Sequence, residues 1–447
     1  MDGLISSSGF RGIALKEITP SFCLAMGEAI SSLHPGVHAV GHDVRFSSPL
    51  LAHSLALGLN SGGSDVKYIG LAPTPATAFY SRGSAGGAMV TASHNPPEYN
   101  GVKLFDPRGA SITLSEYKRI EVSLQERGSR GKGIPGGIRQ GEGLIDYAEA
   151  VAAASGSGKG RKVGLDPGNG STTLTADLIF RLIGIKAQSI NIAPDGSFPG
   201  RGPEPNEGSL GGLSDLVRSK GLDVGFAFDG DGDRVAIVDE MGRSIEQDTA
   251  LAFVMARSLK GRKGSVVVNV DTSAIVDFAV EAAGGRVIRS KVGDPYVLEA
   301  MLKHRAVAGG ETCGAWIFPS MSLCPDGVLS SIVLLNLLDE GAMRASEVRA
   351  GLPGLTLKRK KIPCTNNEKL PLMGKLEAQV RNVYCEEDIL TVDGIRVGFS
   401  DKSWVLVRPS GTEHALRVTA ESPSENKTLA IMGEFVKLVE RTKRGKK

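Results

Sequence analysis

One run of the chain, Thr91 to Lys103, carries residue types that could perform nucleophilic chemistry. Within it a hydroxyl, an imidazole and an amide stand side by side at Ser93, His94 and Asn95. Two prolines follow at once, which stiffens the segment and prevents a helix there. The apolar residues before the run look like a strand end, so we expect a stiff loop that presents Ser93 as a nucleophile. An ordinary surface turn has a similar composition, and the run alone leaves both interpretations open.

An acidic loop indicates a second chemistry. The apolar segment 225–228 runs into Asp229-Gly-Asp-Gly-Asp-Arg234, which places three carboxylates at alternate positions. Such carboxylates repel one another without a cation, and all-oxygen ligation suits Mg²⁺ or Ca²⁺. A calcium-binding EF-hand is excluded, because its sixth position requires glycine where this chain has Arg234, and because strands flank the loop. A phosphatase that uses Asp229 as its nucleophile remains open at this point.

Two further loops carry groups that could bind hydroxyls and phosphate. The glycine-flanked turn at Glu311 and Cys313 offers a carboxylate that can accept hydrogen bonds from hydroxyl groups. The run 408–413, Arg-Pro-Ser-Gly-Thr-Glu, combines a guanidinium, two hydroxyls and a flexible glycine backbone, which suits a phosphate. Arg11, in a similar setting near the N-terminus, is a second candidate anion ligand. Each of these segments could also be an ordinary turn.

Three segments share one order of elements: strand, aspartate, small polar residues, helix, glycine and strand. They cover residues 37–69, 162–192 and 266–288, and in the third we expect Thr272 and Ser273 to cap the helix. A capped helix start and a glycine at the helix end mark a βαβ unit. The sequence therefore predicts three α/β domains with largely parallel sheets, and internal repetition would account for their likeness.

The pattern changes after about residue 360. Segments 391–399, 404–407 and 415–419 read as strands, and residues 424–441 predict an amphipathic helix. Antiparallel strands with helices indicate a smaller α+β domain. The glycine-rich and basic stretches predict a surface loop at 125–143 and a hinge at 154–162. We therefore predict domains at residues 1–150, 151–248, 249–360 and 361–447.

Composition excludes several classes of protein. The chain has 447 residues and a formal net charge of +3, which fits a globular protein of about three domains and does not point to nucleic acid. No apolar run approaches a membrane span, and the N-terminus has no signal-peptide pattern. The five scattered cysteines form no Cys-x-x-Cys pair, which argues against a disulfide framework and a zinc site. We expect a cytoplasmic protein, either a monomer or a homo-oligomer, that acts on a small molecule.

Taken together, the four loops resemble the motifs of the α-D-phosphohexomutase family, which includes phosphoglucomutases, phosphomannomutases and phosphoglucosamine mutases. The resemblance covers the whole chain in order, with one motif per predicted domain. The Thr-Ala-Ser-His-Asn-Pro run around Ser93 resembles the phosphoserine loop, and residues 229–234 match the metal-binding loop. Residues 310–314 look like the sugar-binding loop, and residues 408–413 match the phosphate-binding loop. The implied fold is three similar mixed α/β domains around a central cleft plus a smaller C-terminal α+β domain.

The resemblance also implies a reaction, the transfer of a phosphoryl group between the 6- and 1-positions of a hexose phosphate. Ser93 would carry the phosphoryl group, and a hexose 1,6-bisphosphate would be the intermediate and activator. Mg²⁺ would be held by Asp229, Asp231, Asp233 and a phosphate oxygen on Ser93. Lys103 and His94 are candidate general acids or bases, and Arg234 adds positive charge. The implied sugar ligands are Glu311 and Cys313, and the implied ligands of the non-reacting phosphate are Arg408, Ser410, Gly411 and Thr412. Arg11 remains a further candidate phosphate ligand.

Three positions depart from the family pattern. Cys313 stands where serine is common, Ala315 where histidine or asparagine is frequent, and His414 where proline usually follows. The runs 98–101 and 292–294 resemble the phosphoglucosamine mutase branch and its archaeal-type relatives. The best prediction is therefore a phosphoglucosamine mutase, with a phosphomannomutase or phosphoglucomutase as the alternative. Distant alternatives are the aspartate-nucleophile phosphatase and a non-catalytic sugar-phosphate binder.

Overall fold

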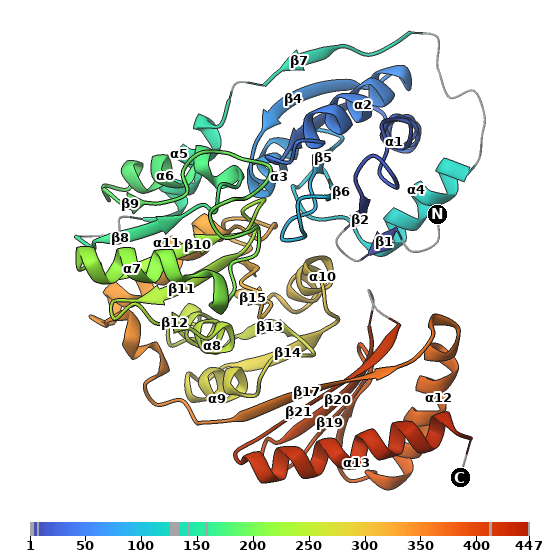
Figure 1. The fold of residues 1–447 in the computed structure, drawn as a ribbon, viewed down its shortest axis with the longest axis vertical. Helices are drawn as coiled ribbons and strands as arrows, with labels where there is room; N and C mark the ends of the chain where they lie inside the picture. The colour runs from blue at the N-terminus through green and yellow to red at the C-terminus, as the bar shows by residue number, and fades with distance from the viewer. Residues whose placement is uncertain are drawn as a thin grey trace.

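The computed structural model describes residues 4–6, 9–125, 134–141, 143–156, 160–410 and 414–445, and it contains four sheets that follow one another along the chain. Figure 1 shows them as successive units of a curved molecule, with the N-terminal sheet in blue at the top and the C-terminal sheet in red at the bottom. Among the described residues, no helix combines the length and apolar character that crossing a membrane requires.

The first sheet has the strand order β1-β2-β6-β5-β3-β4-β7. Its strands are β1 (Ile5–Ser6), β2 (Gly9–Ile13), β3 (Val37–His42), β4 (Asp65–Leu71), β5 (Gly86–Val90), β6 (Tyr99–Phe105) and β7 (Ile138–Gln140). The accompanying helices are α1 (Pro20–Leu33), α2 (Ser48–Ser61), α3 (Thr74–Ser81), α4 (Leu114–Gln125) and α5 (Ile145–Ser155). The expected surface loop at 125–143 is wrong for β7, because its backbone pairs in parallel with β4.

The second sheet has the order β12-β11-β10-β8-β9, and the third has the order β14-β13-β15-β16. The second contains β8 (Val163–Asp166), β9 (Gln188–Ser189), β10 (Val224–Phe228), β11 (Val235–Asp239) and β12 (Ser244–Ile245), with α6 (Ala176–Leu182), α7 (Gly211–Lys220) and α8 (Gln247–Ser258). The third contains β13 (Ser265–Asn269), β14 (Arg286–Ser290), β15 (Ala308–Gly310) and β16 (Trp316–Ile317), with α9 (Ile275–Ala282), α10 (Asp294–His304) and α11 (Gly327–Glu340).

The same four-stranded core recurs in these three sheets. In each, three strands pair in parallel and a fourth pairs antiparallel with the last of them. The cores are β4-β3-β5-β6, β9-β8-β10-β11 and β14-β13-β15-β16. The βαβ units are therefore confirmed, but the sheets are mixed rather than largely parallel. The central strand β13 is buried throughout, as expected of a parallel strand covered on both faces.

The fourth sheet is antiparallel, in the order β17-β21-β20-β19-β18, and confirms the predicted change of pattern. Its elements are β17 (Thr356–Pro363), β18 (Asp388–Leu390), β19 (Ile395–Gly398), β20 (Trp404–Pro409) and β21 (Ala415–Ser422), with α12 (Asn366–Val383) and α13 (Glu425–Lys443). The predicted strand at 391–399 is shorter than expected, because residues 391–394 form a turn.

The buried apolar side chains form several clusters. One runs from Ala39 through the second and third sheets to Val348, and the first sheet also has a large cluster of its own, from Phe10 to Ile120. The fourth sheet and its two helices have their own cluster, which runs from Ile362 to Val439. A small cluster joins the third and fourth units where Trp404 packs near Ala274. The C-terminal unit is therefore a separate body docked on the third unit.

The structure bears on the predicted caps of α9 and on the predicted domain limits. The backbone N-cap of α9 is Ala274, but Oγ of Ser273 accepts the N–H of Ile275 in the first turn at 3.1 Å, so the cap predicted at Ser273 is confirmed. The same hydroxyl donates to Glu421 of the fourth sheet at 2.6 Å. The Thr272 hydroxyl donates to Asn269, so the cap predicted there is wrong. The predicted domain limit at 150/151 falls inside α5, and that at 360/361 falls inside β17. Residues 157–159 of the expected hinge lie outside the described residues. The domain limits stay a prediction.

Candidate active site

Three functional loops occupy equivalent places in the three mixed sheets. Each connects the last parallel strand to the antiparallel strand of its core: β5 to β6, β10 to β11, and β15 to β16. These connections contain Ser93, the acidic loop and Glu311 respectively. Because equivalent loops of similar units leave their sheets at the same edge, the topology can direct all three toward one site.

Ser93 and the acidic loop lie in direct contact. Ser93 is 1% exposed, and its hydroxyl donates to Oδ2 of Asp229 at 2.7 Å. Its Oγ also lies 3.3 Å from Nδ1 of His94. The backbone of Ser93 adopts a φ of 52°, in the left-handed region that residues other than glycine rarely occupy. The structure thus brings together two loops that are 136 positions apart in the chain.

The acidic loop forms a pocket for a hard cation. One ligand atom from each of Asp229, Asp231 and Asp233 lies within 4.8 Å of the others, and all three residues are buried. In the described part of the chain, Oδ1 of Asp231 and Oδ1 of Asp233 are buried without a hydrogen-bond partner. Buried carboxylate oxygens without partners are costly, and a divalent cation would satisfy both. These donors fit Mg²⁺ on the chemistry of the site.

Cationic side chains surround the acidic loop. The ammonium of Lys103 donates to Oδ2 of Asp231 at 3.0 Å and also to Asp233. Burial alone would lower the pKa of Lys103, but these two carboxylates raise it above its usual value. Arg234 lies on the other side, with its Nε 3.7 Å from Oδ1 of Asp233 and 4.0 Å from Oδ2 of Asp229. Both residues therefore supply permanent positive charge next to Ser93.

The pKa shifts of nearby groups follow from the same burial. Burial, reinforced by Asp233 and Asp231, raises the pKa of Asp229 well above its usual range. Burial lowers the pKa of His94 to about 2, and the charges of Arg234 and Arg11 act in the same direction. His94 is therefore neutral near pH 7 and can exchange hydrogen bonds with Ser93, but it carries no charge there.

Glu311 is held by two donors from its own unit. Its Oε1 accepts a hydrogen bond from Nδ2 of Asn269 and another from the backbone N–H of Gly293, both at 2.8 Å. The turn then touches the acidic loop, because the N–H of Val235 donates to the carbonyl of Gly314 at 3.2 Å. Burial raises the pKa of the Cys313 thiol to about 12, so this side chain is a neutral thiol near Glu311.

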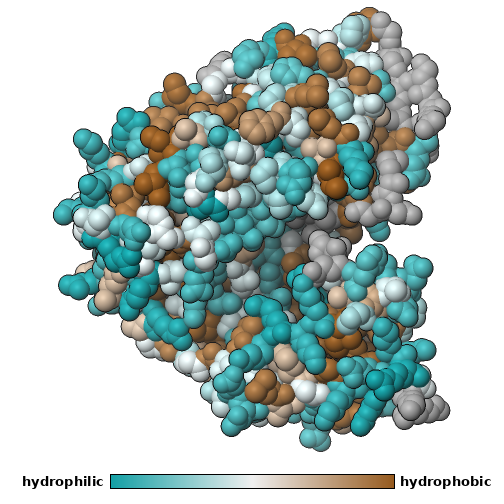
Figure 2. All heavy atoms as spheres, viewed as in Figure 1, coloured by the Kyte–Doolittle hydropathy of each residue, from teal (hydrophilic) through white to brown (hydrophobic). Residues whose placement is uncertain are grey.

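The candidate phosphate ligands of the fourth unit line a cavity whose lining does not include Ser93 or the acidic loop. Arg408 and Ser410 line a cavity of about 760 Å³ together with Lys291 and Tyr296 of the third unit. Figure 2 shows the face hollowed between the C-terminal unit and the rest of the molecule, with hydrophilic residues around the hollow. Gly411 and Thr412 lie outside the described residues.

Arg11 belongs with the Ser93 cluster rather than with Arg408. It lies in β2, paired with Gly101 of β6, and the nearest charges that act on it are those of Asp231, Arg234 and Asp233. Burial lowers the pKa of Arg11, and its Nε is buried without a partner among the described residues. An unpartnered buried donor beside Ser93 suits an anion there.

Several contributors to the site were not predicted. The Thr74 hydroxyl donates to Oδ2 of Asp231 at 2.5 Å, and Asn269 holds Glu311 across 42 positions. Arg45 donates to the carbonyl of Ser93 at 2.8 Å. The only sequence signal for a role of Asn269 in the site was that it is a polar residue at the end of a strand. Nothing in the sequence indicates that Thr74 bonds to Asp231, 157 positions away.

The chain matches four models of one protein family, in order. The models are described as phosphoglucomutase/phosphomannomutase alpha/beta/alpha domain I (residues 3–130), domain II (residues 145–242), domain III (residues 247–354) and the C-terminal domain (residues 360–438). Together they cover most of the chain.

Individual proteins agree with these matches. The chain is 38% identical over 438 residues to a probable phosphoglucosamine mutase of Methanosarcina barkeri, covering 97% of this chain and 98% of that protein. A crystal structure of a phosphoglucomutase/phosphomannomutase family protein from Burkholderia thailandensis superimposes with a TM-score of 0.89 at 25% identity, covering 100% of this chain and 99% of that one. The fold is also shared, with a TM-score of 0.60 at 15% identity over 98% of this chain and 95% of that one, by Aspergillus fumigatus N-acetylphosphoglucosamine mutase in complex with GlcNAc-6P and magnesium.

Proposed function

The chain belongs to the phosphoglucomutase/phosphomannomutase family, and we propose that it is a phosphoglucosamine mutase that uses Ser93 as its phosphoryl carrier. Its general activity is that of a phosphohexomutase, an isomerase that moves a phosphoryl group within a hexose phosphate. The choice of glucosamine phosphate rests on relatives such as that of Methanosarcina barkeri. The alternative substrates are mannose and glucose phosphates.

One observation carries the assignment of Ser93. Its hydroxyl is buried and donates to Asp229, one of three clustered carboxylates. Among the described residues, one oxygen of Asp231 and one of Asp233 have no hydrogen-bond partner and suit a divalent cation. A serine hydroxyl beside carboxylates and without a strong base is a weak nucleophile, whereas a serine phosphate at the same place would face cationic groups. The same contact argues against an aspartate nucleophile, because Asp229 is fully buried and its oxygens already accept from Ser93 and from the N–H of Arg234.

The residues present fit a bound magnesium ion. Asp229, Asp231 and Asp233 would hold it, together with an oxygen of the phosphate on Ser93. When bound, the ion would neutralise negative charge on the phosphoryl group during transfer. Thr74 and Lys103 keep the carboxylate of Asp231 oriented through hydrogen bonds to its Oδ2.

The side chains of the site divide the remaining work. Lys103 and Arg234 stabilise the negative charge of the transferring group, since both are held in their charged forms beside Ser93. In the transfer, the bond from phosphorus to Oγ of Ser93 breaks and a bond to a sugar hydroxyl oxygen forms. Lys103 is the candidate that donates a proton to Oγ of Ser93 and takes up the proton that the sugar hydroxyl loses, so that it ends the transfer in its charged form. In the second half of the reaction these proton transfers reverse.

Substrate binding falls to the other two loops. Glu311, fixed by Asn269 and Gly293, would accept hydrogen bonds from sugar hydroxyls, with Cys313 beside it. Arg408 and Ser410, with Gly411 and Thr412, would hold the phosphate that does not react. A hexose 1,6-bisphosphate formed in the first transfer must turn over before the second, and the cavity between the third and fourth units provides space next to the phosphate ligands.

The direct test combines mass measurement with substitution of Ser93. Wild-type protein incubated with glucose 1,6-bisphosphate and Mg²⁺ is expected to gain one phosphate on Ser93, and Ser93→Ala is expected to gain none and to lose nearly all mutase turnover. Ser219→Ala, which removes an exposed hydroxyl on α7, is the control. Wild-type turnover by Ser93→Ala would contradict the carrier role.

Sugar preference needs a separate comparison. We expect kcat/KM to be highest for glucosamine 1-phosphate among the glucosamine, mannose and glucose 1-phosphates. A higher value for either of the other two would assign the chain to that activity and leave the mutase reaction intact.

A further inference from the structure

The buried guanidinium of Arg45 uses every donor that it has. An arginine offers five N–H groups, and each of those in Arg45 has an acceptor. The Nε–H donates to Oδ2 of Asp43 at 3.0 Å, and the other four N–H groups donate to backbone carbonyls of the loop between β5 and β6 and of the first residue of β6. These carbonyls belong to Ser93 (2.8 Å), Asn95 (2.6 Å), Pro96 (2.5 Å) and Tyr99 (3.2 Å). One side chain therefore fixes the loop on both sides of its prolines.

Asp43 is as fully occupied as Arg45. Its Oδ1 accepts from the backbone N–H of Arg45 at 3.0 Å and from the hydroxyl of Ser48 at 2.6 Å. Its Oδ2 accepts from Arg45 and from the hydroxyl of Thr91 at 2.7 Å. Both charged residues are 0% exposed. A buried ion pair is favourable only when its hydrogen bonds are complete, and this pair meets that condition.

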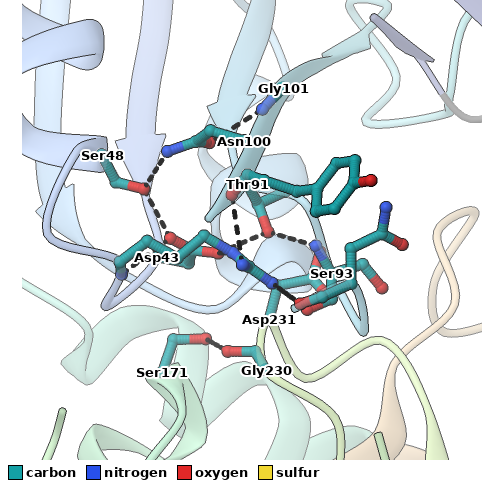
Figure 3. A network of polar contacts seen from close by, with 12 residues as sticks. Asp43, Ser48, Thr91, Ser93, Asn100, Gly101, Ser171, Gly230 and Asp231 are labelled. Atoms are coloured by element: carbon teal, nitrogen blue, oxygen red, sulfur yellow. Dashed lines mark hydrogen bonds and ion pairs between the residues drawn. The ribbon is translucent and has the colours of Figure 1, made fainter. Parts of the chain in front are cut away.

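Thr91 connects this ion pair to the unusual backbone of Ser93. Its hydroxyl donates to Asp43 and accepts the N–H of Ser93 at 2.8 Å, as Figure 3 shows. The carbonyl of Ser93 is held by Arg45. Both peptide groups that flank the left-handed Cα of Ser93 are therefore fixed from the same ion pair, and a strained conformation persists only when its surroundings hold it in this way.

The second unit closes over the same place. The guanidinium carbon of Arg45 lies 5.2 Å from the centre of the Phe198 ring, a cation–π contact. A Cβ on Gly230 of the acidic loop would lie 2.7 Å from the carbonyl oxygen of Ser93 and 3.2 Å from the Phe198 ring. The acidic loop thus packs directly on the peptide that Arg45 holds, and a shift of that peptide would move Ser93 relative to Asp229.

We propose that Arg45, Asp43 and Thr91 form a clamp whose role is to position Ser93: it sets the backbone conformation that aims Oγ at the acidic loop. Arg45 is a positioning residue, because its guanidinium contacts the loop through carbonyls and not through Oγ. The proposal rests on the proposed role of Ser93 as phosphoryl carrier. Phosphoryl transfer depends on placement more than on covalent chemistry, so a loosened clamp should slow transfer without weakening substrate binding.

The test is the rate at which Ser93 takes up phosphate from glucose 1,6-bisphosphate, followed by intact mass, together with steady-state kcat and KM. Thr91→Val removes the hydroxyl with almost no change of shape, and we expect it to lower the loading rate and kcat about tenfold while KM stays within about twofold. Thr91→Ser keeps the hydroxyl and is expected to restore most of the rate.

Arg45→Lys provides a second arm, because a lysine has three donors and no planar fork. We expect a fall of about 100-fold in kcat with little change in KM. Arg161→Lys is the matched control: Arg161 donates to Asp339 and to the carbonyl of Met343, which contribute nothing to the site. It is expected to lower the thermal midpoint and leave kcat unchanged.

The outcomes separate the two proposals. Loading of the wild type combined with a normal rate in Thr91→Val would overturn the clamp alone, as would an equal loss of kcat in Arg161→Lys. Failure of the wild type to load at all would overturn both the carrier role of Ser93 and the clamp that serves it.

Discussion

At the scale of single residues, the clearest chemical feature is that one oxygen of Asp231 and one of Asp233 have no hydrogen-bond partner within the part of the chain that the structure describes. Each is buried, each belongs to a carboxylate whose other oxygen is bound by Lys103, and together with Asp229 they define a small anionic pocket. Lys103 and Arg234 beside the pocket offset part of its negative charge, and the two oxygens remain available to a divalent cation.

A first prediction concerns that cation. Removal of divalent ions with a chelator is expected to abolish mutase turnover, and added Mg²⁺ is expected to restore it. Asp233→Asn removes one ligand charge, so the Mg²⁺ concentration for half-maximal activity should rise about tenfold or more. Asp215→Asn, at an exposed pair with Arg218 on α7, is the control and should not change it. Full activity of the chelated enzyme would contradict the metal assignment.

At the scale of elements, a polar residue at the end of the strand with two parallel neighbours in each four-stranded core (β3, β8 and β13) supports the loop that follows the last parallel strand of that core. Asp43, after β3, holds the Ser93 loop through Arg45 and Thr91. Asp166, at the end of β8, holds Arg201, which donates to the carbonyl of Phe228 immediately before the acidic loop. Asn269, at the end of β13, holds Glu311. The three units therefore share both the order of their strands and the position of the polar residue whose hydrogen bonds support the loop.

A second prediction follows for the third unit. Asn269→Asp would place a carboxylate against Oε1 of Glu311, where the amide of Asn269 now donates a hydrogen bond. Repulsion between the two carboxylates would displace Glu311, the side chain proposed to bind the sugar hydroxyls. We expect KM for the hexose phosphate to rise about tenfold, since a lost charge-assisted hydrogen bond is worth about 1.5–3 kcal/mol. Loading of Ser93 is the internal control and should still occur; Asn382→Asp, exposed on α12, controls for charge. An unchanged KM would show that Glu311 does not need this donor.

A third prediction concerns Asp326, the N-cap of α11. Its carboxylate accepts from the N–H of Leu329 and the hydroxyl of Tyr147, yet burial raises its pKa to about 6. Because the pKa in the folded state lies above that in the unfolded state, the associated stability is present at low pH and is lost as pH rises from about 4 to about 6. At neutral pH the ionised carboxylate of Asp326 lowers the free energy of unfolding.

Asp326→Asn keeps a good cap and removes that titration. The thermal midpoint of the variant minus that of the wild type should therefore be larger at pH 7.5 than at pH 4.5. Most of the change in this difference should fall between these two pH values. Asp146→Asn, in the first turn of α5, serves as a control. A wild-type-minus-variant difference that does not vary with pH would contradict the shifted pKa.

The elements also show how far sequence reasoning could reach. The βαβ units and the acidic loop were predictable because capped helices, glycine punctuation and alternating carboxylates are local patterns. The clamp was not, because four of the acceptors of Arg45 are backbone carbonyls, which leave no mark in the sequence. The cap at Ser273 was predictable for the same local reason, whereas the bond from its hydroxyl to Glu421, 148 positions away, was not. The edge strand β7 was not predicted, because the glycines around it are typical of a surface loop.

At the scale of the whole molecule, one apolar cluster spans the first three units, while the C-terminal unit has its own core and is docked on the third unit through a small apolar cluster and a few polar and aromatic contacts. The guanidinium of Arg396 lies 3.7 Å from the centre of the Trp404 ring and donates to the carbonyl of Val270. The Trp404 indole in turn donates to Glu421, which also accepts from Ser273. This joint connects the candidate phosphate ligands to the site around Ser93.

A fourth prediction concerns this joint. Arg396→Met keeps apolar packing on Trp404 but loses the bonds to the third unit, so docking of the C-terminal unit should weaken. We expect KM for the hexose phosphate to rise about fivefold or more, with a larger radius of gyration in solution scattering. Lys402→Met, which removes an ion pair with Glu281 at the rim of the same joint, should have a smaller effect on both. Equal effects of the two variants would contradict a dominant role for Arg396.

The strand β20 gives this joint a mechanical consequence. Trp404, at one end of the strand, sits at the joint, and Ser410 follows its other end at the cavity. The strand is thus a stiff lever arm of roughly 20 Å, with its fulcrum at Trp404. A swing of about 10° would carry the tip by roughly 3 Å, the length of one hydrogen bond. Because β20 is paired on both sides, we expect such a rotation to move the whole C-terminal sheet and to change which hydrogen bonds Ser410 can make.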